Sequence, residues 1–376
     1  MKKQDKKLLA FIFVLAAFLR VLTLVAAYTG LKTLPFKHSF PYVDAVLEKY
    51  GSPLFWSWAN FDGVHYLMIA REGYIFGLTQ AFFPLFILLV RFSGKIVKNP
   101  LAAGLLLNHL FFAVNLYVFY KLIRLDFKKE VGLWTLIFLS FFPTSFFFLS
   151  LYTESLFLLL VFSSFYLWRK KRHFMAGLVG ALASATRITG IFLVPAFLHE
   201  ARKSEKSQIS KYLSAFLPSI GLLGYMWYLK SRFGDPFLFA HVQEGFGGGR
   251  QTDKLILLYQ VFWRYFKMVL TVERNNPLYF TVWLETGSTA LFLALLFFAY
   301  FKKVRKSYLI FAGLAYFLPT LTGTFSSMPR YVLGLFPGFI ALALIEKRAF
   351  RLAWLALSLF LLFVCTAMFT RGYWVA

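Results

Sequence analysis

Long apolar runs separated by short basic stretches are the main pattern of this chain. The first run begins near Leu8 and ends near Tyr28, roughly 20 residues later, which is long enough to cross a bilayer. Later runs lie at residues 101–123, 131–142, 154–168, 174–185, 188–198, 212–230, 280–301, 307–322, 331–345 and 352–370. Backbone polar groups inside a bilayer must be satisfied within the segment, so runs of this length predict helices. The pattern therefore predicts an all-α integral membrane protein with about 11 transmembrane spans.

Shorter apolar runs and polar gaps divide this single transmembrane domain, residues 1–376. A run at residues 82–90 is too short to span and is soon followed by Arg91, so it predicts an interfacial or re-entrant helix. The glycine-rich residues 245–249 predict a flexible loop, because no strand or P-loop lysine accompanies them. The predicted parts are the first span 1–29, an external loop 30–100 with interfacial helices, spans 101–230 including a broken hairpin 174–198, a second external loop 231–279 and C-terminal spans 280–370.

Composition and charge support a membrane protein rather than a nucleic-acid binder. The chain is 59% apolar and 15% charged, whereas a soluble domain is about 45–50% apolar and about 25% charged. Its formal charge is +25, but 23 of the 41 Lys and Arg residues lie in six clusters beside apolar runs. The clusters are residues 1–7, 121–129, 169–172, 202–211, 302–306 and 347–351. The positive-inside rule assigns such clusters to the cytoplasm, so we expect a cytoplasmic N-terminus and no nucleic-acid partner.

Two residues inside apolar runs need separate comment. Arg20 interrupts the first run, which resembles a signal peptide but is long enough to remain as an uncleaved span. Its side chain either snorkels to the outer interface or points into the helix bundle. Cys365 is the only cysteine, so no intramolecular disulfide can form.

The first external loop holds the most unusual polar residues, in the stretch 56–66 (WSWANFDGVHY). Asp62 and His65 stand there among aromatic rings, including that of Tyr66. Aspartate is depleted from apolar surroundings unless it is paired or functional, because burying its charge is costly. The alternative is an interfacial aromatic belt with an incidental aspartate. This stretch is our candidate site for a general base.

Three further charged residues are predicted on the same, outer side. Glu154 opens a span, where an acid also suits the helix dipole. Arg187 lies at the apex of the broken hairpin, and Arg330 lies in a short outer loop before Tyr331. Guanidinium groups match phosphate oxygens, so the arginines suggest a phosphate site, although either can instead anchor the chain at the interface. No His, Cys, Asp or Glu residues have metal-ligand spacing, so the sequence requires no divalent metal or other cofactor.

Five short motifs, taken together, resemble those of a known family. They occur in this order: residues 61–66 (FDGVHY), 82–86 (FFPLF), 142–143 with 152–156 (FP and YTESL), 186–190 (TRITG) and 329–331 (PRY). This order is similar to that in PIG-V-like mannosyltransferases, which are GT-C-type membrane glycosyltransferases. They are related to the enzyme that adds the second mannose of GPI anchors. The similar landmarks extend over most of the chain.

The resemblance implies roles for particular residues. The family's acid in the first external loop corresponds to Asp62, and the histidine three residues later to His65. The usual tryptophan before the acid is Phe61 here, and the usual Arg-Ser-Asn-Gly run reads Arg-Ile-Thr-Gly from Arg187. These departures keep the acid and the arginine but leave the acceptor open.

The predicted function is an inverting glycosyltransferase that moves a sugar, by resemblance mannose, from a polyprenyl-phosphate donor to a lipid-linked or glycan acceptor. Asp62 is the predicted base, and Arg187 or Arg330 stabilises the departing phosphate. His65, Tyr66, Glu154 and Tyr331 are predicted to line the substrate site, on the non-cytoplasmic face. Membrane lipids are the remaining expected partners.

Two questions stay open at this point. The alternative function is a transporter or flippase for a lipid-linked anionic substrate, which would use the same arginines for binding. The phenylalanine-rich stretches 82–86 and 141–148 either line a groove for the carrier lipid or form ordinary lipid-facing surface.

Overall fold

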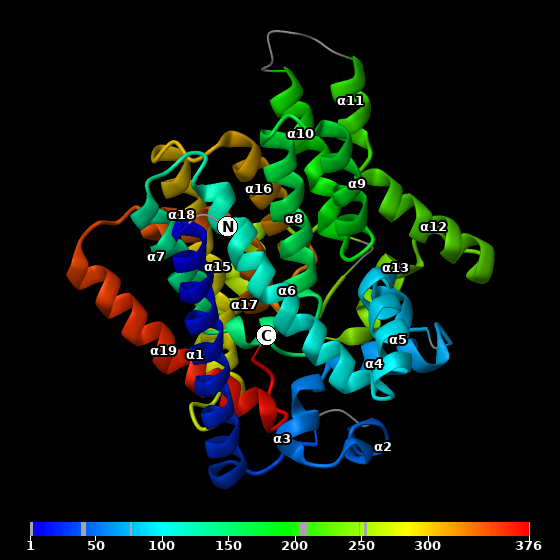
Figure 1. The fold of residues 1–376 in the computed structure, drawn as a ribbon. Helices are drawn as coiled ribbons and strands as arrows, with labels where there is room; N and C mark the ends of the chain where they lie inside the picture. Colours follow the sequence, from blue (N-terminus) through cyan, green and yellow to red (C-terminus); the bar gives the residue numbers. More distant parts are fainter. Residues whose placement is uncertain are drawn as a thin grey trace. The chain divides into compact units, whose positions relative to one another are not determined.

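A computed structural model describes residues 3–38, 43–75, 77–202, 209–247, 249–251 and 254–375. Within these ranges the chain forms helices and turns and no strand, which confirms the predicted all-α class (Figure 1). Parts of the basic clusters 1–7 and 202–211 and of the glycine-rich stretch 245–249 lie outside the described residues.

The chain divides into two compact units. Unit 1 holds residues 1–73, 86–162 and 342–375, and unit 2 holds residues 74–85 and 163–341. The division falls inside three helices, α5 (Pro84–Val97), α8 (Glu154–Arg169) and α18 (Phe336–Ala343).

Four helices of the described chain are long and apolar enough to cross a bilayer. They are α1 (Lys3–Thr33), α6 (Pro100–Ile123), α15 (Pro277–Phe301) and α19 (Arg348–Thr370). Two of them begin at an Asn-Pro pair. The Asn99 side chain accepts a hydrogen bond from the Ala102 N–H at 3.0 Å, and Asn276 caps α15 in the same way at 2.9 Å. A proline in the first turn loses no intrahelical hydrogen bond, so these pairs give well-defined helix starts.

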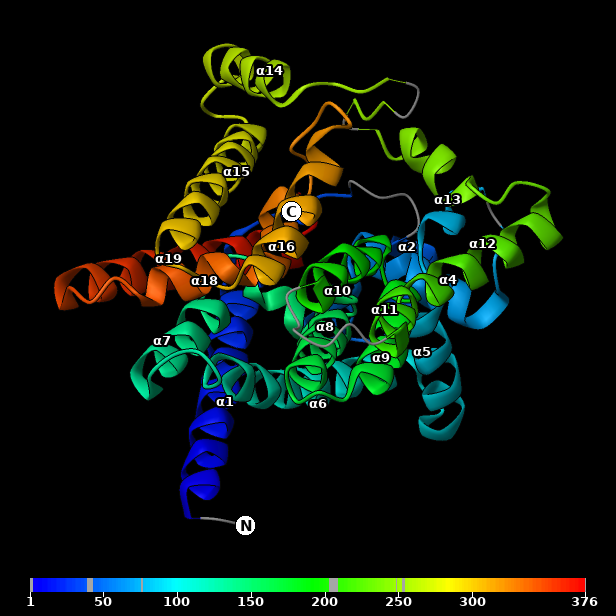
Figure 2. The same cartoon turned by 90° about the horizontal axis from the view of Figure 1, so that it is seen from above.

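Unit 1 is built on the long helices α1, α6 and α19. Figures 1 and 2 show α1 crossing α19, and α6 also packs against α1. The next helix, α7 (Lys129–Ser140), packs against α6, and Glu130 of α7 forms an ion pair with Arg351 of α19. The segment between α1 and α6 adds the helices α2 (Val43–Val46), α3 (Pro53–Trp56), α4 (Asp62–Glu72) and α5 (Pro84–Val97), of which only the first residues of α5 belong to unit 2.

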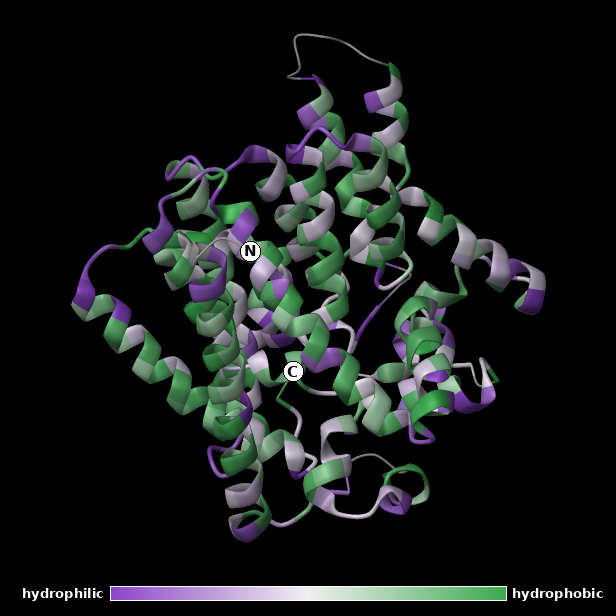
Figure 3. Cartoon of the chain, in the orientation of Figure 1, coloured by the Kyte–Doolittle hydropathy of each residue, from purple (hydrophilic) through white to green (hydrophobic). Residues whose placement is uncertain are grey.

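Unit 2 contains a group of short helices and the long helix α15. Its helices α9 (His173–Ser184), α10 (Leu193–Arg202), α11 (Ile209–Phe216) and α12 (Ser219–Phe233) pack side by side. The others are α13 (Leu238–His241), α14 (Leu258–Thr271), α16 (Lys306–Thr320) and α17 (Met328–Tyr331). Figure 3 shows α9, α10 and α11 mainly green along their length, with hydrophilic residues at the ends of α10 and α11.

Two predicted spans differ from the structure because prolines interrupt them. The run 212–230 is split into α11 and α12 at Pro218, which lacks the N–H that a continuous helix needs. The run 331–345 contains a 3₁₀ turn at Val332–Gly334 and then the short helix α18, whose second residue is Pro337. Helix lengths therefore leave the count of about 11 spans unconfirmed, since only four described helices meet the length of a full crossing.

The phenylalanine-rich stretches lie inside the protein. In unit 1, Phe146 and Phe147 are fully buried, and both rings contact Phe369 of α19 at centroid distances of 4.9 and 5.3 Å. In unit 2, Phe83 packs against Tyr225 at 4.9 Å and against Phe239 at 5.5 Å. Burial of these rings contradicts the alternative that the stretches form ordinary lipid-facing surface, whereas the groove for the carrier lipid stays a prediction.

Candidate functional site

The turn before α4 holds its backbone in a conformation that most residues avoid. Phe61, the residue before Asp62, has φ 59° and ψ −118°. A non-glycine residue with positive φ costs about 1–3 kcal/mol and persists only where its surroundings enforce it. The surroundings here are aromatic, since the Phe61 ring lies 5.8 Å from Phe369 and 5.0 Å from Trp374. The strain therefore falls on the residue that directly precedes the predicted base.

Hydrogen bonds from distant parts of unit 1 hold the same turn. The Asn60 amide donates to the Phe369 carbonyl at 2.9 Å, and the Asn60 carbonyl accepts from the Tyr152 hydroxyl at 2.7 Å. Two residues before Asn60, the Trp58 carbonyl accepts a hydrogen bond from the Leu151 N–H at 2.9 Å. The stretch 58–60 is buried, so these contacts are shielded from water. They fix the position at which α4 begins.

The first two turns of α4 carry three of the predicted site residues. Asp62 is partly exposed at the start of the helix, whereas His65 and Tyr66 are buried. Residues three apart share a helix face, so His65 lies beside Asp62. Burial lowers the pKa of His65, and the nearby Asp62 carboxylate opposes this shift. The imidazole is therefore neutral at pH 7, which leaves Asp62 as the charged group of this helix face.

Glu154 and Tyr66 are connected to this turn through Tyr152. The Tyr66 ring lies edge-on to Tyr152 with centroids 6.2 Å apart, and Glu154, which is 2% exposed, opens α8 two residues later. Asn108 of α6 fixes the backbone there by donating to the Tyr152 carbonyl at 2.9 Å and to the Ser150 carbonyl. In unit 1, the segment that leads into α8 therefore contacts the buried turn that precedes α4, the helix of Asp62.

Arg20 also contacts this region of unit 1. Its guanidinium carbon lies 4.4 Å from the centroid of a Trp58 ring, within cation–π range. Its Nη1 atom is shielded from solvent. The structure therefore supports the alternative in which Arg20 points into the protein.

In unit 2 the other three predicted residues meet at one aromatic ring. The guanidinium carbon of Arg187 lies 5.1 Å from the Tyr331 ring centroid, and that of Arg330 lies 5.2 Å from it. Arg187 is in extended backbone between α9 and a 3₁₀ turn at Ile188–Phe192, as expected for the apex of a broken hairpin. Arg330 is buried in α17. Two cations on one ring favour an anion in their vicinity.

A third arginine, Arg250, was not predicted. Its Nη2 donates to the Ser327 hydroxyl at 3.4 Å and its Nη1 to the Gln243 side chain at 3.0 Å. Ser327 has φ 70°, so the turn before Arg330 is also strained. Arg264 supports this turn from α14 by donating to the Gly323 carbonyl at 3.0 Å. In the sequence, Arg250 is a single cation beside glycines, and nothing in its spacing indicates this contact.

The described residues contain no group of three or more His, Cys, Asp or Glu side chains placed to hold a metal ion. The described part of unit 1 supplies Asp62, His65, Tyr66 and Glu154, and that of unit 2 supplies Arg187, Arg330 and Tyr331. Every contact given above lies within one unit. The chemistry available is one partly exposed carboxylate beside a neutral imidazole, and a pair of guanidinium groups.

Comparison with known proteins identifies a family and several relatives. Residues 6–212, more than half of the chain, match the family described as Mannosyltransferase (PIG-V). The chain is 28% identical over 176 residues to GPI mannosyltransferase 2 of Schizosaccharomyces pombe, a match that covers 46% of this chain and 38% of the yeast protein. It is 29% identical over 196 residues to GPI mannosyltransferase 2 of Cryptococcus neoformans, covering 49% and 44%. The matched stretch thus spans less than half the length of these relatives.

A solved structure supports the fold. The oligosaccharyltransferase of Archaeoglobus fulgidus, crystallised with zinc and sulfate, is similar with a TM-score of 0.51 and 12% sequence identity. The match covers 96% of this chain and 53% of that protein. At this identity the likeness shows the fold alone, which the chain shares with that oligosaccharyltransferase.

The family match includes the whole candidate site of unit 1 and extends into unit 2. Asp62, His65, Tyr66, Glu154 and Arg187 lie within residues 6–212, whereas Arg330 and Tyr331 lie beyond them. The predicted family is therefore confirmed: the chain belongs to the PIG-V mannosyltransferase family.

Proposed function

We propose that this chain is an inverting membrane mannosyltransferase. Its donor is a polyprenyl-phosphate mannose, and its acceptor is a hydroxyl of a lipid-linked or glycan molecule on the non-cytoplasmic face. Family membership and the GT-C fold support glycosyl transfer within a membrane protein. The donor, the stereochemistry and the roles of the residues are inferred from the chemistry of the two units.

In the proposed reaction the acceptor hydroxyl attacks the anomeric carbon of the sugar. Asp62 takes the hydroxyl proton as the new C–O bond forms. The bond between the anomeric carbon and the phosphate oxygen breaks, and its electron pair leaves with the lipid phosphate. A single displacement of this kind inverts the anomeric configuration. No second carboxylate is needed as a nucleophile.

The observation that carries the proposal is the turn that presents Asp62. A strained residue, two buried backbone contacts and aromatic packing all fix the start of α4, where one carboxylate remains partly exposed. Strain of this kind concentrates at functional sites, where geometry must be maintained. A surface aromatic belt requires neither the strain nor the buried hydrogen bonds.

The guanidinium groups of Arg187 and Arg330 are proposed to bind the donor phosphate. Charge grows on that phosphate as the glycosidic bond breaks, and paired guanidinium groups stabilise such charge. Tyr331 holds both groups by cation–π contact, which keeps them near each other despite their like charge. His65, Tyr66 and Glu154 are proposed to shape the substrate site around Asp62.

The side of the membrane follows from the basic clusters. Assigning clusters such as 169–172 to the cytoplasm leaves residues 30–100 outside, where nucleotide sugars made in the cytoplasm do not reach. Lys49 and Lys170 are both exposed, so a cysteine at either position tests on which side of the membrane that position lies. In intact cells, a membrane-impermeant maleimide should label Lys49→Cys but not Lys170→Cys, and the reverse pattern would contradict the orientation.

The donor is tested with purified full-length protein in lipid nanodiscs. Radiolabelled mannose is supplied either on a polyprenyl phosphate or as the nucleotide-activated sugar, together with candidate acceptor lipids. We expect transfer only from the polyprenyl-phosphate donor. Transfer from the nucleotide sugar in the absence of any polyprenyl phosphate would show the proposed donor to be wrong. Movement of the intact lipid-linked sugar across the bilayer without transfer would favour the flippase alternative.

A further inference from the structure

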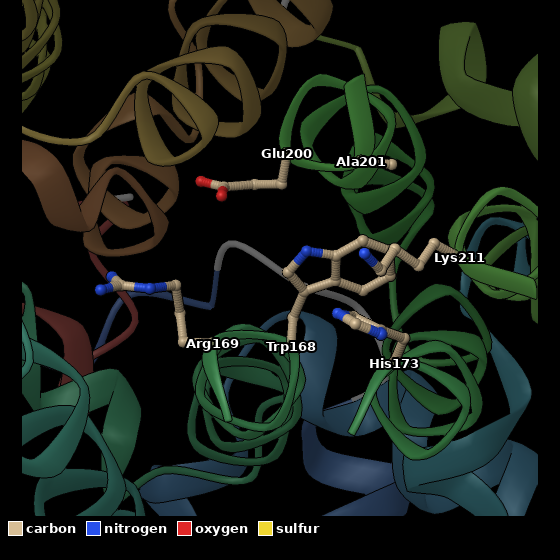
Figure 4. Close-up of a pocket in the computed structure, with 6 residues that line it drawn as sticks. All are labelled: Trp168, Arg169, His173, Glu200, Ala201 and Lys211. Carbon is tan, nitrogen blue, oxygen red and sulfur yellow. The ribbon is translucent and has the colours of Figure 1, made fainter. Parts of the chain in front are cut away.

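A polar pocket lies in unit 2, at one end of the short helices. Its lining residues come from four elements: Trp168 and Arg169 from the end of α8, His173 from the start of α9, Glu200 and Ala201 from the end of α10, and Lys211 from the start of α11. The cavity has a volume of about 140 Å³. In Figure 4 the side chains of His173 and Lys211 lie together beside the Trp168 ring, and those of Arg169 and Glu200 lie on its other side. None of these residues takes part in the reaction proposed above.

Positive charge dominates the pocket. Arg169 and Lys211 each contribute a cation, and Lys171 lies near enough to act on the same imidazole. Burial lowers the pKa of His173, and the ammonium groups of Lys211 and Lys171 lower it further. His173 is therefore mainly neutral at pH 7, when one ring nitrogen donates a hydrogen bond. These groups together suit the oxygens of a phosphate.

The carboxylate in the lining, Glu200, is already engaged by neighbouring groups. The Arg305 Nη1 donates to its two oxygens at 3.1 and 3.3 Å, and the Ser307 hydroxyl donates at 2.7 Å. Both residues lie next to the start of α16. The ion pair with Arg305 offsets the negative charge of Glu200.

The floor of the pocket is rigid. The Trp168 ring stacks on Phe197 of α10 with centroids 4.2 Å apart and planes 6° apart. His173 packs edge-on to Trp168 at 4.7 Å, and the Arg169 Nη1 donates to the Tyr308 hydroxyl at 3.1 Å. Side chains fixed by packing lose little entropy on binding a ligand, which makes a built site more effective than mobile surface lysines.

The pocket adjoins a surface suited to hydrocarbon. On α9, Phe174 and Met175 are 61% and 50% exposed, and on α11, Ile209 and Leu213 are 79% and 65% exposed. The two helices pack against each other. A ligand with a phosphate at one end and acyl chains at the other fits this combination. A free phosphate would use the pocket but not the apolar side chains next to it.

We propose that the pocket formed by Arg169, His173 and Lys211 binds the phosphate of an anionic phospholipid whose acyl chains lie along α9 and α11. Anionic lipids concentrate in the cytoplasmic leaflet of many membranes, and basic pockets between membrane helices bind their headgroups. Arg169, His173 and Lys211 lie in or next to the basic clusters 169–172 and 202–211, which the proposed orientation assigns to the cytoplasm. This site is separate from the binding of the donor phosphate by Arg187 and Arg330.

The test is thermal unfolding of the purified full-length protein in mixed micelles. Phosphatidylglycerol, phosphatidylcholine of matched chain length and inorganic phosphate are titrated separately. We expect phosphatidylglycerol to raise the Tm of the wild type by roughly 3–5 °C more than phosphatidylcholine does, because a ligand that binds only the folded state stabilises it. Inorganic phosphate should produce a smaller shift, since it gains nothing from the apolar surface.

Two variants decide whether the pocket is responsible. Lys211→Gln should lose at least half of the shift caused by phosphatidylglycerol. The matched control Lys170→Gln removes one charge from the same basic end, but Lys170 is exposed and does not line the pocket, so its shift should equal that of the wild type. If Lys211→Gln unfolds without any lipid, His173→Gln replaces it with the same expected loss.

Three results would overturn the proposal. The first is an equal shift with phosphatidylcholine and phosphatidylglycerol. The second is a full shift in both pocket variants. The third is a shift with inorganic phosphate as large as that with the lipid, which would identify a free anion as the ligand. None of these results bears on transfer from the polyprenyl-phosphate donor, so the two proposals fail independently.

Discussion

The two regions that carry the candidate site are built in different ways. In unit 1, the position of Asp62 is set by the main chain, through the strained Phe61 and the buried hydrogen bonds of Asn60. In unit 2, the positions of the Arg187 and Arg330 guanidinium groups are set by side-chain contacts, because both groups lie against the ring of Tyr331. The first region offers one carboxylate at a fixed point, and the second offers two guanidinium groups that lie against one aromatic ring.

This difference suits the two roles. A general base must lie within hydrogen-bond reach of one proton, about 2.6–3.2 Å away, so a rigid backbone position is an advantage. A phosphate that gains charge and then departs with a lipid is well served by paired guanidinium groups, whose planar forks match its oxygens. Substitutions at Asp62 should therefore act on the chemical step, whereas those at the arginines should act mainly on donor binding.

The largest expected effect is that of Asp62→Asn. The amide keeps the size of the side chain and most of its hydrogen bonding but cannot accept the proton. Turnover should fall by roughly 10²–10⁴ while the KM for the donor stays close to that of the wild type. The measurement is steady-state transfer with purified protein.

The matched control is Asp44→Asn, which removes an exposed carboxylate from the same segment between α1 and α6. It should retain full activity. More than half of the wild-type turnover in Asp62→Asn would remove this residue from the mechanism and end the distinction between the two regions.

A smaller effect is expected for Arg187→Lys, because the charge remains and only the planar fork is lost. The kcat/KM for the donor should fall by roughly 10–100-fold, mainly through KM. Arg232→Lys is the control, since Arg232 is exposed at the end of α12.

A double-mutant cycle sharpens this prediction. If Arg187 and Arg330 bind one phosphate, the effects of Arg187→Lys and Arg330→Lys should be coupled by at least about 0.5 kcal/mol. Purely additive effects would show that the two groups act on different ligands, and the shared ring of Tyr331 would then be only structural.

The smallest expected effect concerns the pH dependence of stability in unit 1. Burial lowers the pKa of His65, so the unfolded chain binds a proton more readily than the folded chain does. The contribution of the neutral imidazole is fully present above about pH 6.5 and decreases as the pH falls below that value. His65→Gln stays neutral, so its Tm should drop by about 1–3 °C less than that of the wild type between pH 8 and pH 5.

Other groups also titrate in this range, so the prediction concerns the difference between wild type and variant. An identical decrease of Tm in wild type and His65→Gln would mean that burial of the imidazole has no energetic consequence.

Much of the fold could be predicted from the sequence because the long helices carry local signals. The run 101–123 corresponds to α6, and its start is shifted by one residue because the Asn-Pro pair caps the helix. Hydropathy averaged over a whole run conceals interruptions of the helix. The sequence therefore predicts single spans at residues 212–230 and 331–345, although these runs contain Pro218 and Pro337.

The candidate site was predictable only in part. Asp62 is conspicuous because it is an acid among aromatic residues, and Arg187 because it interrupts apolar sequence. The positive φ of Phe61 has no sequence signal, since glycine rather than phenylalanine is the usual residue there. The contacts of Phe61 with Phe369 and Trp374, and of Arg250 with Ser327, join residues far apart in the chain, where no local pattern reports proximity.

The hydrogen bond between Asn60 and Phe369 has a consequence for biogenesis. The two residues are 309 positions apart, and a ribosome adding about 5–20 residues per second needs about 15–60 s to travel from one to the other. During that interval the turn before Asp62 has already been synthesised but lacks the carbonyl and the rings that hold it. The turn therefore acquires its final geometry only after α19 has been inserted and docked, which makes maturation of the active enzyme a late, post-translational event.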